Sequence, residues 1–268
     1  MPNKRNIEAP INLHGLGRSG TTLLQNLIGE SPDIQTCNET AGLIYCAWRA
    51  GEAALLSSDT SRPLAAEVLP RHLVHLSLVS SMPSRKPRWS QKTGGLPNQV
   101  AWNNITADDR DYASKPFPFP YSWYWSVLAQ AFPRSHDILI IRNYKDVLVS
   151  RALFSGWDAH DMAQAVAVYF NLMSHPAAKI DHCILFDDLV TEPERTSTLL
   201  FERLGVATPS TAARAFDEYC VSSGARSLAG GRQSGFSWSD RYGDYITPEI
   251  ERVVAPALLR LRERFPRS

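Results

Sequence analysis

The residues best suited to chemistry lie near the start of the chain, where a short apolar run meets a turn rich in glycine and hydroxyl groups. The run is Ile11 to Leu13, and the turn after it reads Gly-Leu-Gly-Arg-Ser-Gly-Thr-Thr over residues 15–22. An apolar pattern typical of a helix begins directly afterwards. Free backbone N–H groups and aligned peptide dipoles at a helix start favour an anion. The stretch therefore predicts a strand, a loop and a helix that bind phosphate or sulfate.

The spacing of this turn matches that of a nucleotide-binding P-loop, with one informative difference. Gly15 and Gly20 have the P-loop spacing and two threonines follow, but Thr21 replaces the P-loop lysine. In a P-loop that lysine reaches the β and γ phosphates, and Mg²⁺ binds the next hydroxyl. Here the cation is Arg18, inside the loop. This favours a ligand whose reacting group is not a metal-chelated triphosphate.

Polar side chains also follow three further predicted strands. Glu39 comes after the strand predicted at 34–37, and Lys92 is the next-to-last residue of the strand predicted at 88–93. Arg142 ends the strand predicted at 137–142, with Ser150 in the helix that follows. An arginine fork and a hydroxyl beside a helix start can bind a second phosphate. Because the carboxyl ends of parallel strands meet at one crevice, the sequence predicts two separate anion sites that face this crevice. The ligand would carry two anionic groups some distance apart.

Strands that alternate with helices predict an α/β fold, with a mostly parallel sheet flanked by helices on both faces. A further strand is predicted at 182–186, and helices at 41–54, 64–79, 145–154, 163–173, 191–204, 209–219 and 247–265. We expect Pro256 to kink or split the last helix. The prediction is one domain over residues 1–268, with an irregular insertion at about 103–120 and a candidate lid at about 222–240.

Composition excludes several classes of partner. The 268 residues carry a net charge of +1, so no overall field recruits nucleic acid or an anionic membrane. The four cysteines have no metal-ligand spacing and are too few for a disulfide framework. Cys37 and Cys183 are expected to be buried in strands as reduced thiols. No signal peptide and no membrane span can be recognised, which predicts a soluble, cytoplasmic protein.

Taken together, the two anion-binding motifs resemble those of the PAPS-dependent sulfotransferases, which have a P-loop-like architecture. Residues 18–22 resemble the family's loop for the 5′-phosphosulfate, and the pattern from Arg142 to Ser150 resembles its 3′-phosphate motif. Residues 186–193 and 204–206 resemble a later family segment, and residues 231–235 are faintly similar to its C-terminal cofactor loop. The resemblance implies PAPS as the sulfuryl donor, PAP as the product and no metal. It implies cofactor contacts from Gly17, Arg18, Ser19, Gly20, Thr21, Thr22, Arg142, Ser150 and Arg232.

The catalytic base departs from one branch of the family and resembles another. The segment from Lys92 resembles the Lys-Thr-His of cytosolic sulfotransferases, whose histidine is the base, but Gly94 takes the histidine's place. Glu39, before a threonine, resembles the glutamate that deprotonates the acceptor in tyrosylprotein sulfotransferases. The resemblance therefore implies Glu39 as the general base, with Lys92 and Arg18 stabilising the developing charge. The alternatives are a helix-start carboxylate for Glu39 and a surface lysine for Lys92. Tyr144 and Gly17 also depart from the family, since proline is common at both places.

The sequence does not determine the acceptor of the sulfuryl group. A hydroxyl of a small molecule, lipid or glycan fits the resemblance, and an amine fits it less well; the aromatic residues around Trp123 favour an uncharged or apolar acceptor body. One alternative function is a P-loop kinase, for which Asp187 and Asp188 would hold Mg²⁺ instead of being structural. The other is a non-catalytic nucleotide-binding protein. The oligomeric state is undetermined, and a homodimer is among the options.

Overall fold

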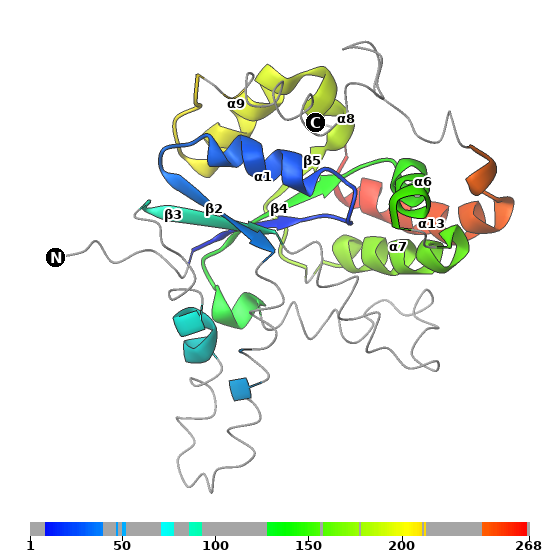
Figure 1. The fold of residues 1–268 in the computed structure, drawn as a ribbon, viewed down its shortest axis with the longest axis horizontal. Helices are drawn as coiled ribbons and strands as arrows, with labels where there is room; N and C mark the ends of the chain where they lie inside the picture. Colours follow the sequence, from blue (N-terminus) through cyan, green and yellow to red (C-terminus); the bar gives the residue numbers. More distant parts are fainter. Residues whose placement is uncertain are drawn as a thin grey trace, which may run out of the picture.

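The predicted strands form a parallel sheet in the computed structural model, which describes residues 9–39, 47, 50–51, 71–77, 86–92, 128–155, 158–176, 178–210, 212 and 243–266. Within these ranges the strand order is β2-β3-β1-β4-β5, and every neighbouring pair is parallel (Figure 1). The strands are β1 (Ile11–His14), β2 (Ile34–Glu39), β3 (Arg88–Lys92), β4 (His136–Ile141) and β5 (His182–Leu185). The predicted α/β class is confirmed, and the carboxyl ends of the strands share one edge.

Helices cover both faces of the sheet (Figure 1). The helices of one face are α1 (Thr21–Gly29), α8 (Phe186–Thr191) and α9 (Pro193–Leu204). The other face carries α6 (Tyr144–Ser155), α7 (Ala159–Ser174) and α13 (Pro248–Arg264), the last preceded by the 3₁₀ turn η2 (Gly243–Tyr245).

Alternation along the central strands explains the two layers of helices. In β1, Ile11 and Leu13 pack with α1, and in β4 Ile138 and Ile140 face the same side. Leu139, one residue on, faces the opposite cluster. Each of these side chains is almost fully buried, which stabilises the fold by about 1.5–3 kcal/mol per side chain. Burial on both faces therefore holds β1 rigidly under the loop that follows it.

Some predicted boundaries are wrong. β5 ends at Leu185, so Phe186 opens α8 instead of closing a strand, and the helix predicted from Thr191 begins at Pro193. Helix α13 continues through Pro256 without a split. Pro256 is exposed, so water can satisfy the carbonyl that loses its partner.

Other predictions meet the structure only in part. Cys37 and Cys183 are free thiols in β2 and β5, but they are half-buried and not fully buried as expected. The insertion at 103–120, the lid at 222–240 and most of the helices at 41–54 and 209–219 lie outside the described residues. Among the residues that are described, no helix is long and apolar enough to cross a bilayer. The single domain over 1–268 stays a prediction.

A row of buried polar side chains crosses the sheet beneath the loop after β1. Gln91 Nε2 donates to Asn12 Oδ1 at 2.6 Å, and Asn12 Nδ2 donates to Asp137 Oδ1 at 3.0 Å. Nε2 of His14, the last residue of β1, lies 2.7 Å from Asp137 Oδ1. Ser135 Oγ donates to the other oxygen of Asp137 at 2.5 Å. A chain of hydrogen bonds therefore links β3 to β1 through Asn12, and β1 to β4 through the carboxylate of Asp137.

This carboxylate is expected to stabilise the fold by hydrogen bonding. Burial raises the pKa of Asp137, but the bonds from His14, Ser135 and Asn12 lower it more, and its net value lies below the ordinary one. Removing the charge leaves these buried partners without the carboxylate they bind. Asp137→Asn should therefore reduce the free energy of unfolding at pH 7 by about 3 kcal/mol. Urea unfolding measures the change.

The pH dependence of the same variant supplies a second check. Because the folded pKa is depressed, the carboxylate stabilises the wild type fully above its unfolded pKa, and this contribution is lost as the pH falls through the folded pKa. The difference in free energy of unfolding between wild type and Asp137→Asn should therefore become smaller below about pH 4. Asp244→Asn, at an exposed carboxylate, is the control. Equal stability of Asp137→Asn and wild type at pH 7 would contradict the assignment.

Candidate active site

The loop after β1, residues 15–20, is a tight turn that leads directly into α1. Ser19 N donates to Leu16 O at 2.9 Å, closing the turn, and Gly20 N-caps α1. Arg18 has a φ of 76° and Gly20 a φ of 98°, a region that costs little only for glycine. A Cβ on Gly20 would also lie 2.5 Å from the Phe186 ring. Thr21, the first residue of α1, is buried and Thr22 is exposed.

One buried hydroxyl in this loop lacks a partner. Ser19 is 1% exposed, and among the residues that the structure describes its Oγ has no hydrogen-bond partner. Leaving such a group unsatisfied costs free energy, so buried polar atoms of this kind call for an explanation. An oxygen of a bound phosphate or sulfate would satisfy it. The loop therefore fits an anionic ligand on its own geometry.

Arginine contacts connect the loop to the start of α6. Arg18 Nε donates to Ser150 Oγ at 3.0 Å, and Arg142 Nη1 donates to the carbonyl of Arg18 at 3.2 Å. Ser150 is buried and Arg18 is exposed. The residues predicted to form two separate anion sites thus touch each other and form one continuous cluster.

The charge of Arg142 is only partly balanced by its surroundings. Its Nε lies 3.7 Å from Asp146 Oδ2, too far for a hydrogen bond, and this buried atom has no hydrogen-bond partner within the described ranges. The guanidinium lies 4.3 Å from the Phe186 ring centroid. Burial lowers the pKa of Arg142, as does the charge of Arg18, while Asp146 and Asp187 raise it. An anion beside Arg142 would favour its charged form.

Lys92 and Glu39 end neighbouring strands at the same level. The register of β2 and β3 pairs Glu39 with Lys92, after an irregularity between residues 37 and 39. Lys92 is 8% exposed, and its Nζ donates to Thr22 Oγ1 at 3.1 Å. The alternative interpretation of Lys92 as a surface lysine is therefore wrong. The ammonium group lies at the first turn of α1, beside the loop of residues 15–20, which we call the anion loop.

Sequence reasoning missed Arg151. This arginine is buried, and its Nε lies 3.4 Å from the carbonyl oxygen of Gly17. The available signal was an arginine directly after Ser150, which would lie on a helix face turned toward the sheet. Its contact with residue 17 depends on the packing of α6 and could not be read from spacing.

The other predicted residues are Arg232 and two aspartates, of which Asp187 is near enough for its charge to act on Arg142. Arg232 is outside the described residues. Asp187 and Asp188 lie in the first turn of α8, where the Asp188 carbonyl accepts from Thr196 Oγ1 at 3.0 Å. In the part of the chain that the structure covers, no group of three or more histidine, cysteine, aspartate or glutamate residues is placed to hold a metal ion.

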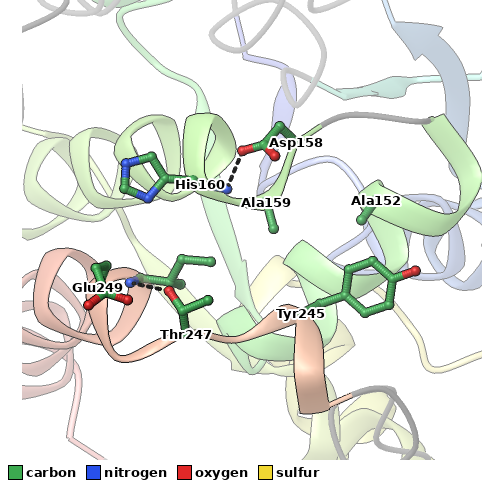
Figure 2. Close-up of a pocket in the computed structure, with 8 residues that line it drawn as sticks. Ala152, Asp158, Ala159, His160, Tyr245, Thr247 and Glu249 are labelled. Carbon is green, nitrogen blue, oxygen red and sulfur yellow. Dashed lines mark hydrogen bonds between the residues drawn. The ribbon is translucent and has the colours of Figure 1, made fainter.

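A hollow lies on the α6 side of the molecule, where α7 and α13 begin (Figure 2). It measures about 540 Å³ and is lined by Ala152, Asp158, Ala159, His160, Tyr245, Thr247, Glu249 and Ile250. Its polar groups cap helices: Asp158 Oδ1 accepts from the His160 N–H at 2.8 Å, and Thr247 Oγ1 accepts from the Ile250 N–H at 3.4 Å (Figure 2). None of the predicted site residues lines this pocket.

Comparison with known proteins agrees with this geometry. Residues 10–210, three quarters of the chain, match the model of the Sulfotransferase family. The sulfotransferase domain from the curacin biosynthetic pathway is similar to the structure at a TM-score of 0.51 and 15% identity, over 92% of this chain and 97% of that one. The sulfotransferase domain of the Synechococcus PCC 7002 olefin synthase is similar at a TM-score of 0.50 and 13% identity, and the match covers 100% of this chain and 98% of that one. These low identities establish the fold alone. No curated protein sequence matches the chain.

Proposed function

Because this chain belongs to the sulfotransferase family, we propose that it transfers a sulfuryl group from PAPS to a hydroxyl group of a small-molecule, lipid or glycan acceptor, or less favourably to an amine. The observation that carries the proposal is the cluster of Arg18, Arg142, Lys92 and Ser150 around a loop whose Ser19 hydroxyl lacks a partner. Positive charge and unsatisfied donors at one helix start suit a ligand with two anionic groups.

The binding roles follow from position. Ser19, Gly20, Thr21 and Thr22 would hold the 5′-phosphosulfate at the start of α1, where peptide dipoles favour negative charge. Arg142 and Ser150 would bind the 3′-phosphate, with Arg232 as a further candidate ligand. Gly17 would contact the ligand through its backbone. When bound, PAPS supplies the sulfuryl group and departs as PAP with the electrons of the broken sulfur–oxygen bond.

The catalytic roles fall to three residues. Glu39 would accept the proton of the acceptor hydroxyl as its oxygen bonds to sulfur, a step that typically contributes about 10²–10⁴-fold. Lys92 and Arg18 would stabilise the charge that builds on the leaving oxygen. The aligned ends of β2 and β3 support this division, because they bring residues 39 and 92 to one level of the sheet.

A thermal-shift experiment tests the proposal against the kinase alternative. PAP at one hundred times its dissociation constant should stabilise the protein by about 2.7 kcal/mol and raise its melting temperature by about 5 °C or more. Mg·ATP should produce no comparable shift, since Thr21 stands where a P-loop has lysine. A shift with Mg·ATP and none with PAP would overturn the proposal. Sulfate transfer to a panel of acceptors then separates an enzyme from a non-catalytic nucleotide-binding protein.

A further inference from the structure

We propose that Arg151 is a positioning residue of the anion loop, which holds the peptide between Gly17 and Arg18 in the orientation that ligand binding needs. The inference deepens the proposed function and rests on it, because the ligand of the loop is taken to be PAPS or PAP. Neither the sequence motifs nor the comparisons assign a role to this arginine.

A side chain on residue 17 would have to displace the guanidinium of Arg151. Arg151 is 8% exposed, and its Nε lies 3.4 Å from the Gly17 carbonyl oxygen. A Cβ built on Gly17 would lie 1.8 Å from Nη2 and 2.7 Å from Cζ of Arg151. Real contacts of Cβ atoms are longer than about 3 Å. The guanidinium therefore fills the volume that any larger residue at position 17 would need.

Holding this carbonyl also fixes the direction of the next N–H group. A trans peptide is planar, so its C=O and N–H point in opposite directions. With the Gly17 carbonyl held toward Arg151, the Arg18 N–H is turned to the other side of the loop. Arg142 holds the next carbonyl, that of Arg18, at 3.2 Å, and the following N–H, that of Ser19, bonds Leu16 O. Two arginines thus orient two consecutive peptides of the turn.

The loop needs such an external restraint because of its own composition. Residue 17 is a glycine, the residue type with the greatest backbone freedom. Arg18, next to it, has the left-handed φ of 76° that a non-glycine residue adopts only when its surroundings impose it. Arg18 also donates to Ser150, which is proposed to bind the 3′-phosphate. A change in the orientation of the peptide at residue 17 would therefore disturb the proposed 3′-phosphate site as well.

The test is a double-mutant cycle of Gly17→Ala and Arg151→Ala, with the dissociation constant of PAP and the melting temperature as readouts. Each single variant should weaken PAP binding by about tenfold or more, the size expected for one lost charge-assisted hydrogen bond. In the Arg151→Ala background, adding Gly17→Ala should change the affinity by less than about threefold, because the collision is gone. Arg151→Lys should remain weak, since lysine lacks the planar fork. Arg134→Ala, at an exposed arginine, should bind PAP like the wild type.

Several results would overturn the inference. Wild-type PAP affinity in Arg151→Ala would do so, as would full additivity of the two substitutions. If wild type itself failed to bind PAP, the proposed function would fall. The melting temperatures of the same four proteins would then still report whether residues 17 and 151 are coupled, and additive melting-temperature changes would overturn the contact itself.

Discussion

Glu39→Gln should lower kcat by at least about a hundredfold, because it removes the proposed general base. The dissociation constant of PAP should stay within about twofold of wild type, since the substitution keeps the shape of the side chain and PAP lacks the reacting sulfuryl group. Steady-state kinetics with PAPS and calorimetry with PAP measure the two quantities. The acidic limb of the kcat/KM profile, which reports ionisation of the base, should disappear in the variant.

The control for this experiment is Glu30→Gln, at the exposed C-cap of α1. It removes the same charge at the opposite end of α1 from the edge of the sheet where β2 and β3 end, so kcat should not change. If Glu39→Gln kept wild-type kcat, the base would have to be sought elsewhere. The helix-start interpretation of Glu39 would then be favoured.

Arg142→Ala should raise the dissociation constant of PAP by about 10–150-fold, the range of one hydrogen bond to a charged group. The structure supports a large effect, because the side chain is mostly buried and its Nε lies 3.7 Å from Asp146, beyond hydrogen-bond distance. This buried donor is therefore left for a bound phosphate to satisfy. The loss should appear in KM for PAPS more than in kcat, since the 3′-phosphate lies away from the reacting sulfur. Calorimetry and initial rates separate the two.

Ser150→Ala is the matched variant. It should also raise the KM for PAPS, by less than Arg142→Ala does. It deletes one hydroxyl that accepts from Arg18 and leaves both arginines in place. Arg203→Ala, on α9 and away from the loop, serves as the control. Unchanged KM values for both Arg142→Ala and Ser150→Ala would remove the two residues from the phosphate site.

Local features were readable from the chain alone. The strand, loop and helix around residues 11–29 follow from an apolar run, a glycine-rich turn and helical periodicity, all of which depend on neighbours in sequence. The α/β class and the alignment of polar residues at strand ends follow from the alternation of elements. The proposal of which residues bind the anion rests on spacing within single segments such as 18–22 and 142–150.

Contacts between distant segments required the tertiary structure. Arg18 bonds a hydroxyl 132 positions away, and Arg151 contacts a carbonyl 134 positions away. Lys92 was open to interpretation as a surface residue until β3 placed it beside α1. The sequence states neither the strand order nor the rotation of α6 about its axis. A side-chain pattern defines which face of an element is buried, whereas the partner it meets depends on how all elements pack at once.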